Sequence, residues 1–241
     1  MTNLTNLTVF SAKNLSGPLP DAWNGMLNLR VFDLEVFSIS GTLPESWSSM
    51  TQLTDVSVMA QLTGTLPASW AAFTSLNSIA LSGSNITGTL LESWSNMTQL
   101  TMMTVSNSQL TGTLPASWAA LPSLNFIELS SNNLNGSLPV EWSYMTQLSL
   151  VELSNNRLLG SLPESWVGMS QLRYVALVNN TLISNMELPH SHVLACCPLQ
   201  EHIMVQVPCC YHQFAETSCL PLHEGLHVHL YSKERAICKD V

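Results

Sequence analysis

The sequence predicts a solenoid, a stack of short coils that repeat one structural unit along most of the chain. Three observations lead to this prediction: a regular spacing of tryptophan, the same spacing of glycine, and a stretch, "QLTGTLPASWAA", that occurs twice. The tryptophans stand 23 or 24 residues apart, at Trp23, Trp47, Trp70, Trp94, Trp118, Trp142 and Trp166. Glycines keep the same rhythm, at Gly17, Gly41, Gly64, Gly88, Gly112, Gly136 and Gly160. A fixed period of this length is typical of repeat proteins, in which each unit contacts only its neighbours.

Each unit begins with a short strand pattern. In "LNFIEL", the residues Leu124, Ile127 and Leu129 are the apolar positions that we expect to face inward. One such strand cannot bury its apolar face alone. Neighbouring units must therefore stack, so that their strands share one continuous core.

The remaining positions of the unit have physical roles of their own. A turn position holds Asn132, Asn156 and Asn180, whose amides suit the buried backbone groups of adjacent coils. The glycine suits a backbone with positive φ or a close approach, and the proline of L-P suits the first position of a short helical turn ending in tryptophan. We expect the tryptophans to stack in a column, namely Trp47, Trp70, Trp94, Trp118, Trp142 and Trp166.

These residues carry a family resemblance. The unit L-x-x-h-x-L-x-x-N-x-L-x-G-x-L-P-x-x-W-x-x-M resembles a leucine-rich repeat, and "LxGxLPxxW" resembles the plant-type subclass. The wording "GTLPxSWxxMTQL" is similar to the promastigote surface antigens of kinetoplastid parasites, over about residues 4–184. The resemblance implies a curved α/β solenoid, with a parallel β-sheet on the concave face and short 3₁₀ turns and irregular segments on the convex face. It also implies surface display and a binding role.

Several positions depart from the pattern. Leu91 replaces the expected proline in one unit, and Phe37, Ser84 and Ser108 replace the asparagine in others. The C-terminal half of the array is therefore closer to the consensus than the N-terminal half.

Two composition regimes divide the chain. Residues 1–185 form an array of about seven units of 23–24 residues, and residues 186–241 form a non-repeat tail that holds all six cysteines and all seven histidines. Three interpretations of the tail stay open: a disulfide cap over the end of the array, a disordered segment, or the product of a shifted reading frame. We predict no metal site, because adjacent cysteine pairs lack the C-x₂₋₄-C spacing of zinc ligands.

The array offers no catalytic constellation. It contains no histidine for a Ser–His–acid triad and no glycine-rich phosphate loop. Glu128 and Glu152 stand one unit apart, but on an open sheet we expect them to be solvated, unlike the carboxylates of a glycosidase cleft. We therefore predict no enzymatic activity and no cofactor. The net charge of −9 argues against nucleic acid, and no apolar stretch reaches the roughly 18 residues of a membrane span.

The outward-facing strand positions are the candidate binding surface. Side chains on either side of the central apolar residue point out of the sheet. We predict that a protein ligand contacts Met102, Phe126, Glu128, Leu150, Glu152, Tyr174, Asp33 and Asp55. Seven strands about 4.8 Å apart give a face on the order of 500 Å², below the roughly 800 Å² that each partner buries in a standard interface. We therefore expect this section alone to bind weakly.

The predicted function is that of a non-catalytic protein-interaction module, similar to the surface antigens in adhesion or host recognition, and working as a monomer. Two alternatives stay open: a plant-type receptor or inhibitor ectodomain with a protein ligand, and a non-functional fragment of a larger surface antigen. The resemblance implies a cell-surface or extracellular location, although "MTNLTNLTVF" shows no secretory signal and the sequence shows no anchor. The candidate N-glycosylation sites are Asn85, Asn96, Asn135 and Asn179.

Overall fold

The computed structural model describes residues 3–10 and 15–182, together with the backbone of residues 204–206. The chain divides into two units, Met1–Cys209 and Cys210–Val241, and the second unit lies wholly outside the described residues. The cysteines and histidines of the tail lie outside them as well. The disulfide cap, the disordered segment and the shifted reading frame therefore all stay predictions.

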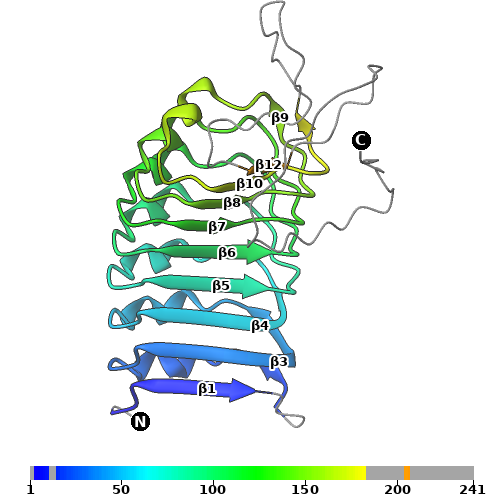
Figure 1. Cartoon of the computed structure of the whole chain (residues 1–241). Coiled ribbons are helices and arrows are strands. Elements are labelled where there is room, and N and C mark those ends of the chain that lie inside the picture. Colours follow the sequence, from blue (N-terminus) through cyan, green and yellow to red (C-terminus); the bar gives the residue numbers. More distant parts are fainter. Residues whose placement is uncertain (1–2, 11–14, 183–203, 207–241) are drawn as a thin grey trace, which may run out of the picture. The chain divides into compact units, whose positions relative to one another are not determined.

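A parallel β-sheet runs along the coils, each strand hydrogen-bonded to the strand of the next coil (Figure 1). Its strands, in order, are β1 (Asn6–Phe10), β3 (Val31–Thr42), β4 (Asp55–Thr63), β5 (Ser78–Ser82), β6 (Met102–Ser106), β7 (Phe126–Glu128), β8 (Leu150–Glu152), β10 (Tyr174–Ala176) and β12 (Met204–Gln206). The short strand β2 (Gly17–Pro18) pairs with β3, and β9 (Leu159–Gly160) pairs with β11 (Thr181–Leu182).

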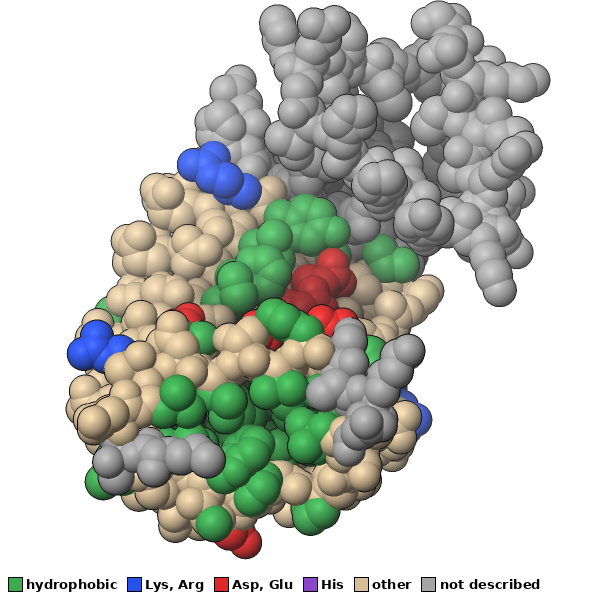
Figure 2. Space-filling model, turned by 90° about the horizontal axis from the view of Figure 1, so that it is seen from below, with side chains coloured by type: hydrophobic (Ala, Val, Ile, Leu, Met, Phe, Trp, Pro, Cys, Tyr) green, Lys and Arg blue, Asp and Glu red, His purple; other side chains and the backbone are tan. Residues whose placement is uncertain are grey.

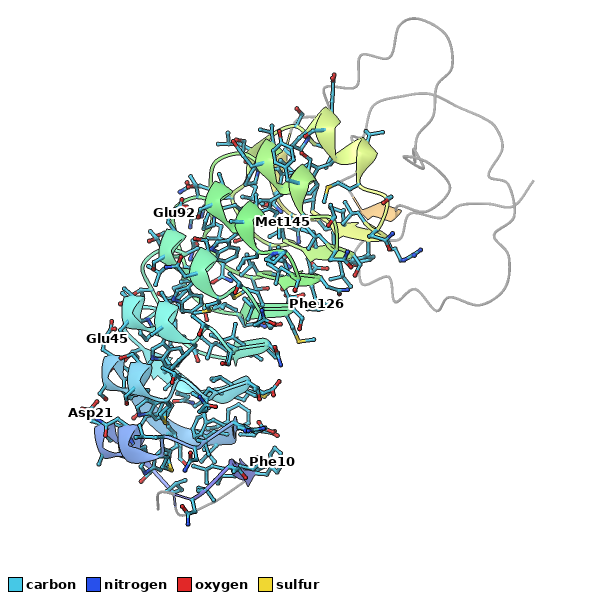
Figure 3. The ribbon with its side chains drawn as sticks, turned by 90° about the vertical axis from the view of Figure 1, so that its left-hand side faces the viewer. Phe10, Asp21, Glu45, Glu92, Phe126 and Met145 are labelled. Carbon is cyan, nitrogen blue, oxygen red and sulfur yellow. The ribbon has the colours of Figure 1, made fainter. Side chains whose placement is uncertain are left out.

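One 3₁₀ turn per coil lies on the opposite side from the sheet. The turns are η1 (Asp21–Gly25), η2 (Glu45–Ser49), η3 (Ala68–Ala72), η4 (Glu92–Asn96), η5 (Ala116–Ala120), η6 (Val140–Tyr144) and η7 (Glu164–Gly168). Figure 3 shows the stack curving with the strands on its inner side and the turns on its outer side. The predicted α/β solenoid, with a parallel sheet on the concave face and 3₁₀ turns on the convex face, is confirmed.

Each turn starts just after the L-P dipeptide, or after Leu90 and Leu91 in η4, and runs past its tryptophan. The proline is therefore the N-cap residue, and the prediction that it occupies the first position of the turn is wrong. In η2, the Trp47 N–H donates to the Pro44 carbonyl at 3.3 Å, and the Met50 N–H donates to the Trp47 carbonyl at 2.8 Å. The second hydrogen bond extends the turn beyond Trp47, so the prediction that tryptophan ends the turn is wrong. In η4, Leu91 stands in place of the proline and the turn still forms. The turn needs only the backbone carbonyl at this position, and the Trp94 N–H donates to the Leu91 carbonyl at 3.2 Å.

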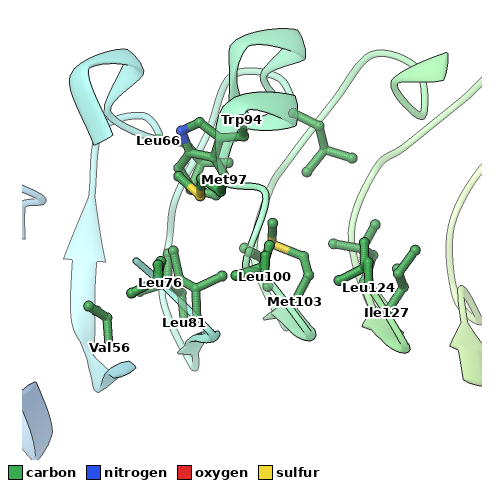
Figure 4. Close-up of a cluster of buried hydrophobic side chains, with 14 of the residues drawn as sticks. Val56, Leu66, Leu76, Leu81, Trp94, Met97, Leu100, Met103, Leu124 and Ile127 are labelled. Carbon is green, nitrogen blue, oxygen red and sulfur yellow. The ribbon is translucent and has the colours of Figure 1, made fainter. Parts of the chain in front are cut away.

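The core is a continuous stack of inward-facing apolar side chains. The strand residues Leu124, Ile127 and Leu129 are fully buried, as are their counterparts in the neighbouring coils. Figure 4 shows such rows lying side by side, with Trp94 and Met97 on the turn side of the same cluster. No coil can bury these side chains by itself, so the stacking of coils supplies the hydrophobic stabilisation.

The tryptophans link each coil to the one before it. Six indole Nε1–H groups donate to carbonyl oxygens of the preceding coil at 2.9–3.1 Å: Trp47 to Pro20, Trp70 to Pro44, Trp94 to Pro67, Trp118 to Leu91, Trp142 to Pro115 and Trp166 to Pro139. Neighbouring indoles also stack in the pairs Trp23/Trp47, Trp47/Trp70, Trp118/Trp142 and Trp142/Trp166, with ring centroids 6.0–6.3 Å apart. Among the described residues, Trp94 stacks on neither neighbouring indole, so the predicted column is interrupted there. A buried indole whose N–H is satisfied in this way keeps its full hydrophobic contribution.

Asparagine side chains make a second ladder at the turn after the strands. The Asn156 amide donates to the carbonyl of Leu129 in the preceding coil at 2.9 Å and to that of Leu153 at 3.0 Å. Its oxygen accepts from the Leu134 N–H at 3.0 Å. Asn132 and Asn180 make the equivalent bonds.

All seven repeated glycines have a left-handed backbone, and those from Gly41 to Gly136 also have a close neighbour in the preceding coil. Gly88 has a φ of +82°, and a Cβ added there would lie 2.9 Å from Cγ2 of Thr65 in the preceding coil. The same close approach recurs at Gly64, Gly112 and Gly136, which face Thr42, Thr89 and Thr113 of the preceding coils. A side chain would therefore be strained at this position and would also collide with the preceding coil.

Candidate functional site on the concave face

An apolar row crosses four adjacent strands of the sheet. The parallel register pairs Met102 with Phe126, Phe126 with Leu150 and Leu150 with Tyr174, so each side chain has the next one as its direct neighbour. Met102 is 39 % exposed, and the other three are partly exposed. We call these four residues the apolar row. Figure 3 places Phe126 on the strand side of the coils, across the solenoid from Glu92.

Two glutamates lie beside the apolar row. Glu128 and Glu152 are direct partners in the register of β7 and β8. Each carboxylate is anchored to its own turn: Glu128 Oε1 accepts from the Ser130 N–H at 3.1 Å, and Glu152 Oε1 accepts from the Ser154 N–H at 3.0 Å. The Tyr174 hydroxyl donates to Glu152 Oε2 at 3.3 Å, so the apolar row and the glutamate pair form one continuous patch.

Burial perturbs both kinds of side chain. Burial raises the pKa of the Glu128 carboxyl, the hydrogen bonds from Ser130 oppose this rise, and the Glu152 charge adds to it. Burial also raises the pKa of the Tyr174 hydroxyl, and the neighbouring Glu152 charge raises it further. The expectation that these glutamates are solvated therefore holds only in part, because both carboxylates are partly buried.

The two aspartates predicted for the same surface lie elsewhere on it. Asp33 is paired with Ser57, and Asp55 is paired with Val31, so the aspartates stand in different columns of β3 and β4. Strands β5 and β6 separate them from Glu128. The eight predicted contact residues therefore divide into a C-terminal patch of six and an N-terminal pair of aspartates.

Sequence reasoning missed a third outward column near the N-terminal end. β3 and β4 are 12 and 9 residues long, so the register continues from Phe10 to Glu35 and on to Met59. Phe10 is 58 % exposed and Met59 is 40 % exposed. The alternation in "VFDLEVFSIS" could have indicated this extension. Figure 2 looks onto the end of the solenoid that carries β1, where hydrophobic side chains gather.

Other kinds of site find little support in the described residues. A hollow of about 210 Å³ is lined by Asn3, Thr5, Asn28, Arg30 and Gln52, smaller than the roughly 300–1,000 Å³ of small-molecule pockets. In residues 3–10 and 15–182, no group of three or more His, Cys, Asp or Glu side chains is placed to hold a metal ion. Across this same part of the chain, no helix is long and apolar enough to cross a membrane.

The four candidate glycosylation sites are solvent-exposed: Asn85, Asn96, Asn135 and Asn179. Two of their side chains make contacts along the array, since the Gln109 amide donates to Asn85 Oδ1 at 3.1 Å and the Asn179 amide donates to Asn155 Oδ1 at 2.7 Å. None of the four lies on a strand of the concave sheet.

Comparison with family models matches the leucine-rich-repeat description over residues 74–134 and again over residues 147–169. The chain thus contains leucine-rich repeats, and its fold is that of a leucine-rich-repeat solenoid. This fold is typically non-catalytic. The narrower resemblance to kinetoplastid surface antigens stays a prediction, and no curated protein sequence matches the chain.

Solved leucine-rich-repeat structures share the fold. The ectodomain of the Arabidopsis thaliana receptor kinase GASSHO1/SCHENGEN3, in complex with CASPARIAN STRIP INTEGRITY FACTOR 2, is 28% identical with a TM-score of 0.65, over 74% of this chain and 21% of that one. The Arabidopsis receptor kinase HAESA, in complex with a peptide hormone and a co-receptor, is 26% identical with a TM-score of 0.56, over 70% and 33%. A Leptospira interrogans leucine-rich-repeat protein is 25% identical with a TM-score of 0.65, over 76% and 45%. The leucine-rich-repeat protein described here thus spans about a fifth to a half of the length of these relatives.

Proposed function

We propose that this leucine-rich-repeat protein is a non-catalytic recognition module whose concave face binds an extended segment of another protein. The observation that carries the proposal is the apolar row on β6, β7, β8 and β10. Core packing does not require these side chains, because the stacked coils bury their inward-facing residues without them. Apolar side chains that gather on a surface without a packing role are candidate contacts for a partner.

The relatives support the kind of ligand. The receptor kinase HAESA was solved with a peptide hormone and the GASSHO1/SCHENGEN3 ectodomain with CASPARIAN STRIP INTEGRITY FACTOR 2, and this chain resembles part of each. A concave face roughly 30 Å long would accommodate about nine residues of extended chain at about 3.3 Å per residue. A short peptide segment therefore suits the face better than a large globular partner.

A finer proposal follows from the sequence resemblance: a surface-antigen-like glycoprotein, displayed outside the cell for adhesion or host recognition. The exposure of all four candidate glycosylation sites favours it. The test is staining of intact and permeabilised source cells with an antibody against the repeats, combined with enzymatic removal of N-glycans. Staining only after permeabilisation, with no mobility shift after glycan removal, would contradict both display and glycosylation.

The concave-face proposal can be tested with a random peptide display library selected on the full chain. We expect the selected peptides to lose at least about tenfold in affinity on the Phe126→Asp/Tyr174→Asp variant. The matched control is Val140→Asp/Tyr144→Asp, which alters an aliphatic and an aromatic side chain that are 56 % and 75 % exposed on η6. A loss of binding on the control variant and not on the concave-face variant would refute the proposal.

A further inference from the structure

The inference concerns the chemistry of the partner, and it rests on the proposed function. The sheet strands of the described coils carry aspartate and glutamate but no lysine, arginine or histidine. The described arginines, Arg30, Arg157 and Arg173, lie outside those strands and are exposed. A ligand that approaches this face therefore meets negative charge without a positive charge of the sheet to balance it.

The glutamate pair is the part of this negative charge that lies beside the apolar row. Glu128 and Glu152 are direct neighbours in the parallel register, and like charges placed opposite each other in a sheet destabilise it. Within the described residues no basic side chain relieves the repulsion. Glu128 Oε2 also lacks a hydrogen-bond partner there, because both bonds from Ser130 reach Oε1.

The side chains next to the pair favour an organic cation over a small ion. Phe126 and Tyr174 belong to the apolar row one column away, with Leu150 between them in the register. Aromatic faces attract guanidinium and ammonium groups, and apolar neighbours suit the methylene stem of a long basic side chain. A guanidinium also carries several N–H donors in a fixed plane, which suits two carboxylates held side by side.

From this arrangement we infer that the C-terminal half of the concave face recognises an extended peptide that carries arginine or lysine, with the cation between Glu128 and Glu152. Aliphatic or aromatic side chains of the same peptide pack on the apolar row. In an extended peptide successive side chains point to opposite sides. Alternating basic and apolar residues therefore reach the glutamate pair and the apolar row together.

The test uses fluorescein-labelled heptapeptides and the full chain, with fluorescence anisotropy as the readout. The probes are Leu-Arg-Leu-Arg-Leu-Arg-Leu and the uncharged Leu-Gln-Leu-Gln-Leu-Gln-Leu. The site variant is Glu128→Gln/Glu152→Gln. Its matched control is Glu141→Gln/Glu164→Gln, which makes the same change of charge in the same two coils, at exposed positions in η6 and η7.

We expect the arginine peptide to bind the wild type and the control variant alike, and to bind the site variant at least about tenfold more weakly. We also expect salt to weaken this binding, since it screens exposed charges. An equal loss of affinity on the site variant and on the control variant would mean that the net charge of the protein attracts the peptide nonspecifically. This result would overturn the inference.

The remaining outcomes separate the inference from the proposed function. If the glutamine peptide binds as tightly as the arginine peptide and loses affinity only on Phe126→Asp/Tyr174→Asp, the concave face is a binding site but its preference for a cation is refuted. If neither peptide binds the wild type while library-selected uncharged peptides do, the cation preference is refuted and the proposed function stands. If no peptide from any source binds the concave face, both are refuted.

Discussion

The close approach between glycine and threonine leads to a sharp prediction about the array. Substitution of Gly88 by alanine places a side chain at a φ of +82° and a Cβ 2.9 Å from Cγ2 of Thr65. The left-handed backbone costs about 1–2 kcal/mol for a residue with a Cβ, and overpacking costs about 1–3 kcal/mol. We expect Gly88→Ala to lower the free energy of unfolding by about 2–5 kcal/mol. At about 2–4 °C per kcal/mol for a protein of this size, the Tm falls by roughly 4–20 °C.

Two other glycines separate the two contributions. Gly83 has a φ of +69° but no heavy atom within 4 Å of an added Cβ, whereas Gly168 has neither a positive φ nor such a neighbour. We expect Gly83→Ala to show the backbone cost alone, about 1–2 kcal/mol. Gly168→Ala should be neutral or slightly stabilising, because alanine restricts the unfolded chain. Urea and thermal unfolding followed by circular dichroism measure all three.

A double-mutant cycle isolates the collision. Thr65→Ser removes the methyl group that an alanine at position 88 would meet. The loss of free energy of unfolding caused by Gly88→Ala should therefore be smaller in the serine background than in the wild type, by at least about 1 kcal/mol. The reasoning is refuted if Gly88→Ala and Gly83→Ala destabilise equally, or if the serine background makes no difference. Either result would mean that the two neighbouring coils move apart at little cost to accommodate the Cβ added at position 88.

Three further predictions test other parts of the structure. Asn156→Ala should cost about 1–3 kcal/mol in urea unfolding, because it strands the Leu134 N–H in the core, while the Leu129 and Leu153 carbonyls keep the bonds that Asn132 and Asn180 donate to them; a cost below about 1 kcal/mol would contradict a structural role for the ladder. Trp142→Phe should cost about 2–4 kcal/mol in thermal unfolding, because it removes a 2.9 Å hydrogen bond to the Pro115 carbonyl along with buried surface; an unchanged Tm would contradict the link between coils. The folded-state pKa of Glu128 is raised, so its contribution to stability is present below the unfolded pKa and is lost as the pH rises through the folded pKa. Glu128→Gln should therefore raise the Tm at pH 7 and lose this advantage near pH 3.5, and a lower Tm at pH 7 would contradict the cost of burying this charge.

The sequence could predict the parts of the fold that depend on a local repeat. The period of tryptophan, the inward-facing trio such as Leu124, Ile127 and Leu129, and the glycine with positive φ all follow from what one coil needs from its neighbours. The lengths of β3 and β4 do not follow from the repeat, although the alternation in "VFDLEVFSIS" could have indicated the extension of β3. They depend on how far the register continues between coils, and this extension creates the third column with Phe10 and Met59.

The candidate site was predictable in its membership but not in its chemistry. Strand alternation assigns Phe126 and Glu128 to the outward face. It does not show that Glu128 is partly buried or that the Tyr174 hydroxyl donates to Glu152. These properties depend on side chains of neighbouring coils, and one strand considered alone contains no information about them. The separation of Asp33 and Asp55 from the patch follows from the same coil-by-coil register.

The uneven chemistry of the concave face is the strongest argument for a function in its C-terminal half. All coils of the array face the same packing demands, so differences between them at outward positions do not come from the fold. The middle strand β5 presents Ser78 and Ala80 at positions where β7 presents Phe126 and Glu128. Burying a carboxylate beside a second one costs stability, and the apolar row exposes surface that water disfavours. A partner with an apolar stem and a positive charge would relieve both costs at once, which favours recognition over drift as the origin of this patch.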